Sequence, residues 1–333
     1  MENVLVTGGA GYVGSGLLRE LLSKNYNVTC VDSLMFGGES LLDIWHNVNF
    51  NFIKCDINNW DTMNNILTNN QFDAVIHLAA IVGDPACRLQ SELAIKTNWH
   101  STKWLLDKSL KIGIKKFVFA STCSNYGKMD NPDVYVDEES PLAPVSLYAE
   151  LKVKFENYML SEIDKRNDFC PTALRFSTVY GMSPRMRFDL TVNEFTKDLA
   201  MGKELIIFGE QFWRPYCHVK DFSNAFITIL RAPDSKVAYN VFNVGDTSEN
   251  YTKQMLVDEI IKSIPHSKVK YVNKNEDPRD YRVNSDKIKR ELGFEITMRV
   301  PDGIEELKRM VQEGVIQDPE DQKYYNIPHT ATF

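Results

Sequence analysis

NVLVTGGAGYVGSGLLRELL (residues 3–22) joins a short apolar run, a glycine-rich turn and a segment with leucines at helical spacing. The apolar run predicts a buried strand, and the leucine spacing predicts a helix directly after the turn. Glycines in such a turn let a pyrophosphate approach the backbone at the positive helix N-terminus. The stretch therefore predicts a dinucleotide site, although a plain glycine turn would show the same letters.

The alternation of apolar runs and amphipathic segments continues beyond this stretch. Because the runs are nearly continuous and do not alternate with polar residues, they favour a parallel sheet covered on both faces. The predicted fold is α/β, a doubly wound parallel sheet of the Rossmann type. The expected strands are 3–8, 27–32, 49–56, 74–80, 115–122 and 171–181.

After residue 181 this regularity ends, and Arg, Asn, Pro and aromatic residues become frequent. We expect a Rossmann domain over 1–181, with a returning segment near 215–250 whose strand is 239–245. A smaller, interleaved C-terminal substrate domain is expected mainly over 182–317. The tail, 318–333, is expected to be a surface strap or partly disordered.

Composition excludes several classes of function. The net charge is -7 and Lys and Arg form no long run, so nucleic acid is not an expected partner. No apolar run approaches the roughly 20 residues of a membrane helix, and the chain starts almost at once with a strand. We therefore expect a cytoplasmic protein without a membrane partner. The six scattered cysteines lack metal-binding spacing, which predicts buried free thiols and no metal.

Asp32 ends the second predicted strand, at the distance from the glycines typical of dinucleotide-binding units. A carboxylate there accepts hydrogen bonds from ribose hydroxyls and repels a 2′-phosphate, which predicts NAD as the cofactor; a strand-end cap is the alternative. Asp56 ends the third strand, where it would meet the adenine amino group or form a turn with Asn58. His77 lies in a buried strand and is interpreted as a core residue.

Tyr148 and Lys152 are four residues apart on a predicted helix, so their side chains face the same way. A neighbouring ammonium favours the phenolate, and we expect it to lower the pKa of the tyrosine toward neutrality. Tyr148 would then act as a general base during hydride transfer. Ser121 and Thr122 close the fifth strand at the end where such sheets bind ligands. We therefore predict Thr122, Tyr148 and Lys152 as catalytic, although YxxxK alone is also typical of a surface helix.

TGGAGYVGS (7–15), HLAA (77–80), Asn98, STCSNYG (121–127) and YAELK (148–152) together resemble the extended short-chain dehydrogenase/reductase family of nucleotide-sugar epimerases and dehydratases. The resemblance covers nearly the whole chain. It implies that Thr122 assists the tyrosine, that Asn98 supports the cofactor, and that a homodimer forms through helices near 91–111 and 146–163. The predicted cofactor-binding residues are Gly8, Gly11, Tyr12, Val13, Gly14, Asp32, Asp56, Ile57, Leu78, Ala79, Ala80, Asn98, Tyr148 and Lys152.

The chain departs from the resemblance directly after Thr122. The 4,6-dehydratases of the family carry an Asp-Glu pair there to expel water, whereas this chain has Cys123 and Ser124. Dehydration therefore lacks its acid and base. We interpret Cys123 as a small residue that shapes the sugar pocket, with a nucleophile as the alternative.

A nucleotide diphosphate requires cations, and the resemblance implies Asn193, Arg214 and Arg279 around it. Arg185 and Arg187 are further candidates, with a surface salt bridge as the alternative for each arginine. His218 and Asp221 resemble a structural motif. Thr178 stands where the family often has Asn. The predicted substrate-binding residues are Val82, Thr122, Cys123, Ser124, Thr178, Arg185, Arg187, Asn193, Arg214 and Arg279.

These features predict NAD-dependent oxidation at C4 of a nucleotide-diphosphate sugar, by a 4-dehydrogenase or as the first half of a 4-epimerisation. LMF (34–36), VGDP (82–85) and SPRMRFDL (183–190) also resemble a subgroup of surface-polysaccharide enzymes that includes GDP-heptose 4-dehydrogenases. The alternatives are an NAD(P)H-dependent reductase of nucleotide-4-ketosugars and a non-catalytic NAD-binding protein of the same fold.

Overall fold

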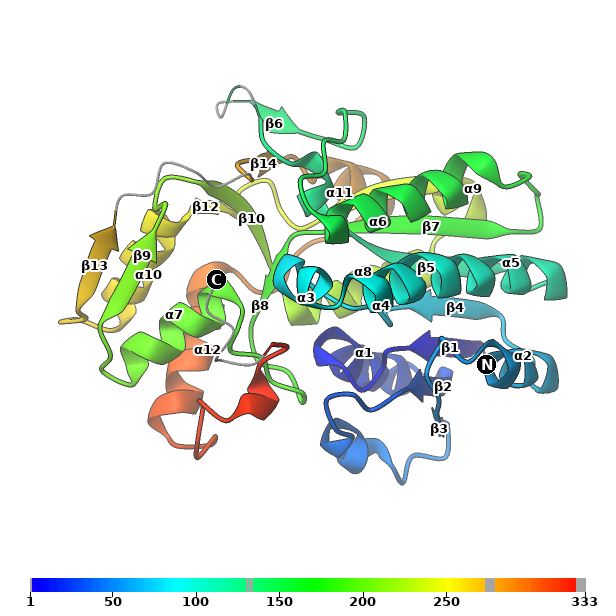
Figure 1. The fold of residues 1–333 in the computed structure, drawn as a ribbon, viewed down its shortest axis with the longest axis horizontal. Helices are drawn as coiled ribbons and strands as arrows, with labels where there is room; N and C mark the ends of the chain where they lie inside the picture. The colour runs from blue at the N-terminus through cyan, green and yellow to red at the C-terminus, as the bar shows by residue number, and fades with distance from the viewer. Residues whose placement is uncertain (1, 130, 132–133, 273–278, 328–333) are drawn as a thin grey trace.

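Seven parallel strands form the central sheet of the protein, in the order β3-β2-β1-β4-β5-β7-β11. The computed structural model describes residues 2–129, 131, 134–272 and 279–327 (Figure 1). This arrangement confirms the predicted doubly wound α/β sheet. The strands are β1 Asn3–Thr7, β2 Asn27–Asp32, β3 Phe50–Lys54, β4 Ala74–His77, β5 Lys116–Thr122, β7 Cys170–Phe176 and β11 Asn240–Val244.

Several predicted strands end earlier than expected, by the largest margin in two cases. The run 74–80 is a strand only as far as His77. The run 171–181 divides into β7 and β8 (Thr178–Tyr180). β8 leaves the central sheet and pairs with β10 (Trp213–His218), so the break at Ser177 is the point where the chain passes from one sheet to another.

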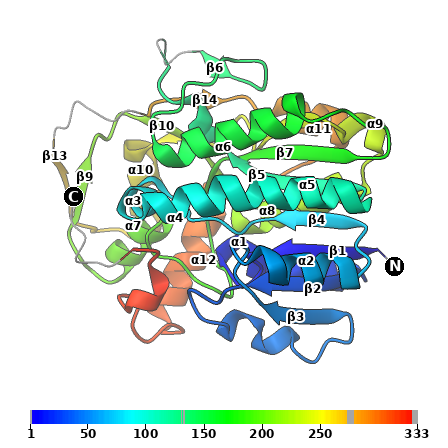
Figure 2. The same cartoon turned by 45° about the vertical axis from the view of Figure 1, so that its right-hand side comes forward.

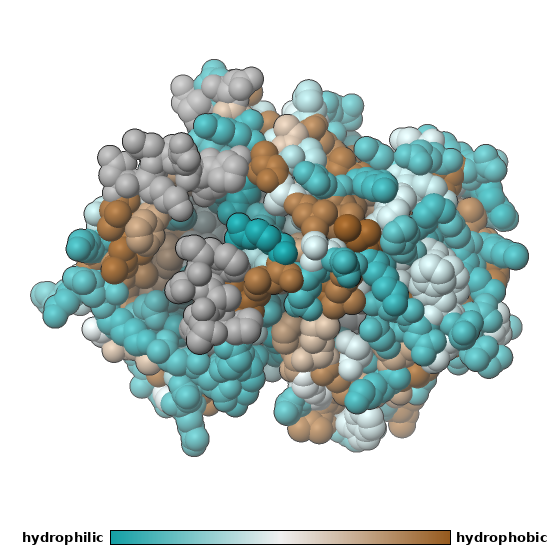
Figure 3. All heavy atoms as spheres, in the orientation of Figure 1, coloured by the Kyte–Doolittle hydropathy of each residue, from teal (hydrophilic) through white to brown (hydrophobic). Residues whose placement is uncertain are grey.

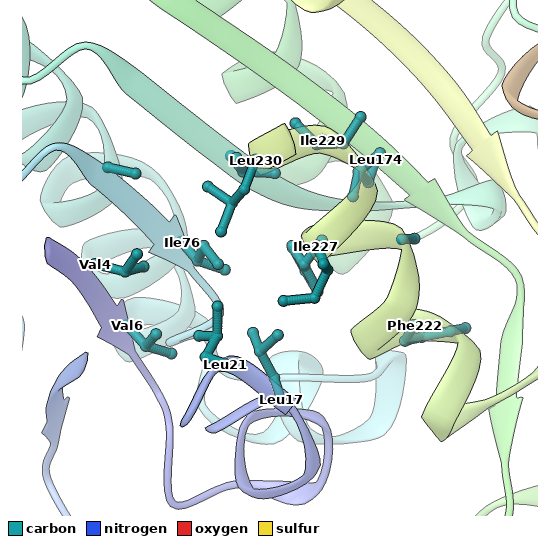
Figure 4. Close-up of a cluster of buried hydrophobic side chains, with 14 of the residues drawn as sticks. Val4, Val6, Leu17, Leu21, Ile76, Leu174, Phe222, Ile227, Ile229 and Leu230 are labelled. Carbon is teal, nitrogen blue, oxygen red and sulfur yellow. The ribbon is translucent and has the colours of Figure 1, made fainter. Parts of the chain in front are cut away.

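Helices cover both faces of the sheet because successive strand residues point to opposite sides. Val4 and Val6 pack with leucines of α1 (Tyr12–Ser23) and with α8 (Val219–Arg231), as Figure 4 shows. Leu5 points the other way, into a second cluster. In both views α5 and α6 lie in front of the sheet and α8 behind it (Figure 1, Figure 2). The helices on that front face are α2 Trp60–Asn69, α5 Thr102–Ile112 and α6 Leu147–Asn157.

A second group of elements forms the lobe on the left of Figure 1. Its core packs Phe188, Tyr216, Leu256 and Leu307 together. Its strands are β8, β9 Leu205–Phe208, β10, β12 Asn250–Thr252 and β13 Val269–Val272, and its helices are α7 Thr191–Ala200, α10 Lys253–Ser263 and α12 Val300–Gln312. We propose that this lobe is the substrate domain, mainly 182–317, and that 1–181 with β11 is the cofactor domain.

The remaining short elements connect these parts. They are the strands β6 Tyr135–Val136 and β14 Arg282–Val283, the α-helices α3 Asp84–Leu89, α4 Ser91–Ile95, α9 Asp234–Val237 and α11 Asp286–Leu292, the π-helical segments η2 Lys96–Ser101 and η4 Tyr158–Glu162, and the 3-10 turns η1 Glu39–Ile44, η3 Cys123–Tyr126 and η5 Gln322–Tyr324.

Hydrophilic residues cover most of the face in Figure 3, and small apolar groups appear near its middle, where α3 and α6 meet. Within the described ranges, no helix has both the length and the apolar character needed to cross a bilayer. All six cysteines are free and buried, as their sequence context predicts.

Candidate active site

A cavity of about 270 Å³ opens at the carboxyl edge of the central sheet, where the glycine loop, the ends of β2, β4 and β5, and α6 meet. Ligands of open α/β sheets bind at this edge. The structure brings thirteen of the fourteen predicted cofactor residues to the cavity wall, and Asn98 alone lies away from it. Those thirteen are Gly8, Gly11, Tyr12, Val13, Gly14, Asp32, Asp56, Ile57, Leu78, Ala79, Ala80, Tyr148 and Lys152.

Gly8 and Gly14 are required by close backbone packing around the loop. Gly8 has a φ of +77°, and a Cβ atom there would lie 2.6 Å from the backbone nitrogen of Ala79. A Cβ at Gly14 would collide with the carbonyl oxygen of Gly8. Because neither position has room for a side chain, the first turn of α1 stays close to β1 and its backbone N–H groups remain open to a phosphate.

Asp32 is held by the backbone at the end of β2. Its Oδ2 accepts a hydrogen bond from Ala10 N at 3.0 Å, and its Oδ1 accepts one from Leu34 N at 2.8 Å. Burial raises the pKa of this carboxyl. The carboxylate still lines the cavity, so its remaining lone pairs fit the two hydroxyls of an adenosine ribose and disfavour a 2′-phosphate.

Asp56 forms the turn that its sequence position suggested and also lies on the cavity wall. Its Oδ1 accepts a hydrogen bond from Asn58 N at 2.9 Å, which forms a turn, and the residue also lines the cavity. The glycine loop, Asp32 and Asp56 therefore fit a dinucleotide laid along the edge of the sheet.

Asn98 does not contact the cavity, and the expectation that it binds cofactor directly is corrected by the structure. The buried side chain accepts from Ile81 N at 2.9 Å and donates to Ile81 O at 2.9 Å. The amide thus fixes the backbone just after β4, and any support for the cofactor passes through Ile81, which lines the cavity.

Thr122, Tyr148 and Lys152 all line the cavity, as the catalytic prediction requires. Ser146 caps the N-terminus of α6, which presents Tyr148 and Lys152 on one face. The Lys152 ammonium donates to the carbonyl of Ala120 at 2.7 Å and lies 5.7 Å from the centre of the Tyr148 ring. Lys152 is therefore anchored to β5, next to Thr122.

Burial controls the protonation of this pair in the protein without cofactor. It lowers the pKa of Lys152 to about 8. It raises the pKa of Tyr148 well above its usual range, and the neighbouring Cys87 and Asp84 raise it further. The expectation that Lys152 alone brings the tyrosine toward neutrality is therefore wrong for the protein by itself, because removing the phenol from water outweighs a cation turned toward Ala120.

Cys123 and Ser124, which were predicted to bind substrate, do not line this cavity. The Cys123 thiol donates to the carbonyl of Arg175 at 3.2 Å in the protein interior, where burial raises its pKa. It neither shapes the cavity nor has the thiolate character of a nucleophile. Ser124 Oγ accepts a hydrogen bond from the hydroxyl of Tyr281 at 3.4 Å.

Of the residues predicted to bind substrate, Val82, Arg185 and Arg187 line the cavity, whereas Thr178 and Asn193 do not. Side chains alternate along a strand, so Ser177 and Val179 face the cavity and Thr178 faces away. The cavity is therefore lined by the two neighbours of Thr178 and not by Thr178 itself.

Asn193 is wholly buried, and its amide is used within the protein. It accepts from Gly181 N at 2.9 Å and donates to Arg187 O at 2.8 Å. In this structure it therefore positions the segment that carries the arginines and does not face a ligand.

Arg214 and Arg279 lie in a second group near the start of α6. The Arg214 guanidinium is 5.3 Å from the centre of the Tyr281 ring. Arg279 donates to Asp84 at 3.0 Å, and the other oxygen of Asp84 accepts from Ser146 Oγ at 2.6 Å. Since Ser146 caps the helix of Tyr148, these contacts connect Arg279 to the catalytic helix through Asp84.

The two histidines in the sequence patterns have structural partners. His77 lies between the hydroxyls of Thr7 and Thr102, and burial lowers its pKa to about 3. His218 contacts Glu306 at 2.9 Å. Asp221 accepts three hydrogen bonds from Thr297 and Met298, so it anchors a turn.

Sequence reasoning missed several residues of the cavity wall. Ser177 follows the end of β7 and could have been found from that position, whereas Phe36, Phe222 and Asn326 reach the cavity only through tertiary packing.

Residues 4–245 match the sequence pattern of the NAD dependent epimerase/dehydratase family. The chain belongs to this family. It follows that the cofactor is NAD and that the protein is an enzyme of NAD-dependent nucleotide-sugar modification.

Relatives across this family resemble the chain over most of its length. The chain is 29% identical to a probable UDP-arabinose 4-epimerase 3 of Oryza sativa subsp. japonica, over 88% of this chain and 78% of that protein. It is 30% identical to a UDP-N-acetyl-alpha-D-glucosaminuronate decarboxylase of Bacillus cytotoxicus, over 82% of this chain and 83% of the relative. A crystal structure of UDP-glucose 4-epimerase from Thermotoga maritima with UDP-glucose superimposes with a TM-score of 0.82 at 28% identity, covering 94% and 99% of the two chains. The finer resemblance to GDP-heptose 4-dehydrogenases stays a prediction.

Proposed function

We propose that the protein oxidises C4 of a nucleotide-diphosphate sugar, as the first half of a 4-epimerisation or as a 4-dehydrogenase. The observation that carries the proposal is that Thr122, Tyr148 and Lys152 line the same cavity as the glycine loop and Asp32. Similarity to two UDP-sugar 4-epimerases supports the choice of C4. A role in surface-polysaccharide synthesis rests only on the sequence resemblance.

Tyr148 is the general base of the proposed reaction. Bound NAD supplies the hydride acceptor and, when oxidised, a positive ring that favours the phenolate. The phenolate takes the proton of the C4 hydroxyl as the C4 hydride departs, which leaves a 4-keto sugar. The Thr122 hydroxyl donates to the reacting oxygen. The Lys152 ammonium, which is anchored to the Ala120 carbonyl of β5, stabilises the phenolate.

Water elimination is not proposed, although the family includes dehydratases. Among the described residues of the cavity wall, the carboxylates are Asp32, at the end of β2, and Asp56, just after β3. Both fit the adenosine end of the cofactor. Ser124 and Cys123, which replace the acidic pair, carry no carboxylate and do not face the cavity.

A panel of UDP-, GDP-, dTDP- and CDP-sugars tests the proposal. Wild-type enzyme with bound NAD should give reduced-nicotinamide absorbance and a 4-epimer or 4-keto product by NMR. Tyr148→Phe should retain NAD and lose about 100-fold or more of turnover, as expected for loss of a general base. Tyr271→Phe, at an exposed site on β13, is the matched control. Undiminished turnover in Tyr148→Phe would exclude the proposed base.

The product separates the two forms of the proposal. An epimerase returns the hydride to the other face of the sugar and needs no added oxidant, whereas a dehydrogenase stops after one turnover unless NAD is replaced. If added NADH and a 4-keto sugar were required for any reaction, the enzyme would instead be a ketoreductase.

We also propose that the chain forms a homodimer through the helical segments near 91–111 and 146–163. Leu89 and Ile95, beside and within the first segment, are exposed apolar residues. Sedimentation analysis should give twice the mass of one chain, and a monomer at micromolar concentration would exclude this interface.

A further inference from the structure

The C-terminal strap (residues 318–327) crosses the substrate lobe and reaches the cavity. Tyr325 is buried, and its hydroxyl accepts from the Lys197 ammonium at 2.9 Å. Lys197 also pairs with Glu320 at 3.0 Å. Tyr324 accepts a backbone hydrogen bond from Phe188 at 2.9 Å. These contacts fix the strap on and beside α7.

The end of the strap lies between the two lobes. Asn326 lines the cavity, and its backbone N–H donates to Asp189 at 3.2 Å. Ile327 packs on the apolar cluster that includes Tyr148 and Leu147. The strap therefore contacts the loop of the arginines on one side and the catalytic helix on the other.

Arg185 and Arg187 line the same cavity as Asn326, and their hydrogen-bond partners differ. Arg187 is neutralised by Asp189, with Nε and Nη2 at 2.9 and 2.8 Å from its two oxygens. Arg185 is only 7% exposed, and no described residue accepts a hydrogen bond from its Nε or Nη2. Burial and the charge of Arg187 lower the pKa of Arg185 to about 10. Asp189 thus neutralises Arg187, whereas Arg185 has no carboxylate of its own among the described residues.

Asn326 has a buried acceptor that lacks a hydrogen-bond donor, whereas Arg185 has donors that lack an acceptor. Its Oδ1 is buried, and no donor in the described part of the chain reaches it. Buried polar atoms rarely lack a hydrogen-bond partner. The two Arg185 donors and the Asn326 acceptor in one cavity therefore indicate a bound ligand that carries both acceptors and donors. A diphosphate supplies the acceptors and a ribose hydroxyl supplies the donor.

The position of Arg185 favours the cofactor over the sugar nucleotide as that ligand. Its guanidinium carbon lies 4.3 Å from the centre of the Phe36 ring, in the loop that follows the ribose-binding Asp32. Its backbone N–H donates to Ser15 Oγ of α1 at 3.3 Å, one turn from the glycine loop. Phe36 and Arg185 both line the cavity.

We propose that Arg185 and Asn326 bind the diphosphate and ribose of NAD from the side opposite the glycine loop, so that the C-terminal strap retains the cofactor. The proposal concerns retention of the cofactor and not the sugar reaction. It can therefore be tested by measuring NAD release in the absence of turnover. It also reassigns Arg185 from the sugar nucleotide to the cofactor.

The test measures the rate of NAD release from loaded protein after dilution, together with the NAD dissociation constant. Arg185→Gln should raise the release rate about 10- to 100-fold, because a charged hydrogen-bond donor is lost. Asn326→Ala should raise it about 3- to 10-fold. Lys323→Ala, an exposed strap residue that pairs with Asp321, should leave it unchanged.

Wild-type release rates in both Arg185→Gln and Asn326→Ala would overturn the proposal. So would weaker binding of UDP-glucose or UDP without any change in NAD release, since the two groups would then belong to the sugar-nucleotide site. Thermal unfolding of each variant without NAD shows whether the substitution has destabilised the protein as a whole. Failure of every sugar in the panel would leave the release measurements fully interpretable.

Discussion

Removal of the Glu156 carboxylate should test how the end of β5 is held in place. Glu156 Oε1 accepts from Arg175 Nε at 2.9 Å, and its Oε2 accepts from Ser121 Oγ at 2.8 Å. The two charged side chains are only 1% and 5% exposed. Ser121 adjoins Thr122, so this buried pair lies directly behind the proposed catalytic group.

Glu156→Leu should lower the free energy of unfolding by about 3–5 kcal/mol, because the Arg175 guanidinium is left buried without a counter-charge. Replacing both partners, in Glu156→Leu/Arg175→Met, should recover most of that loss, since the desolvation cost of the cation is also removed. Glu150→Gln, on an exposed position of the same helix, is the control.

Urea unfolding followed by circular dichroism measures these differences. A loss below about 1 kcal/mol in Glu156→Leu, the value typical of exposed ion pairs, would contradict the reasoning. A double variant no more stable than the single variant would contradict it too, because the penalty would then not come from the unpaired arginine.

Three further predictions concern the cofactor half of the site. Gly8→Ala should abolish measurable NAD binding by calorimetry, because the new Cβ would displace the backbone at Ala79. Lys152→Met should abolish turnover yet stabilise the cofactor-free protein at pH 7 by up to about 3 kcal/mol, since the folded pKa is about 8 and the ordinary value is 10.5. That advantage should fade as the pH rises through this interval, where the unfolded lysine also loses its proton, and a pH-independent difference in unfolding free energy would refute it. Asn98→Leu should weaken NAD binding about 10-fold in a titration by releasing Ile81, and unchanged affinity would show that the clamp is not needed.

The cofactor half of the site could be predicted from the sequence because its signals are local. The glycine loop joins a strand to a helix, Asp32 ends β2, Asp56 comes just after β3, and Tyr148 and Lys152 share one helical face. Each of these relations depends on spacing within one element or between two consecutive elements, which the sequence displays directly.

The rest of the site depended on relations that spacing does not display. The prediction of Thr178 was displaced by one residue from the side chains that line the cavity, Ser177 and Val179. The chain passes from one sheet to another at Ser177, and this passage decides which side chains of the segment face the cavity. Asn98 and Asn193 carry the right chemistry for a ligand, but their amides bind backbone instead. Asn326 lies far along the chain and reaches the cavity only because the strap packs on the other lobe.

The raised pKa of Tyr148 shows a different limit. A sequence reveals that a lysine is near, but not how much water the folded protein removes from the phenol, and here desolvation is the larger effect.

The position of β11 has a consequence for how the chain is made. This strand pairs with β7 along Asn240–Val244, and α8 covers one face of the same sheet, yet both are encoded after much of the second lobe. A nascent chain that ends at Gly181 would expose the open edge of β7 and a bare apolar layer, both prone to aggregate. The central sheet is therefore complete only after the ribosome has synthesised Val244, and we expect the two lobes to fold together.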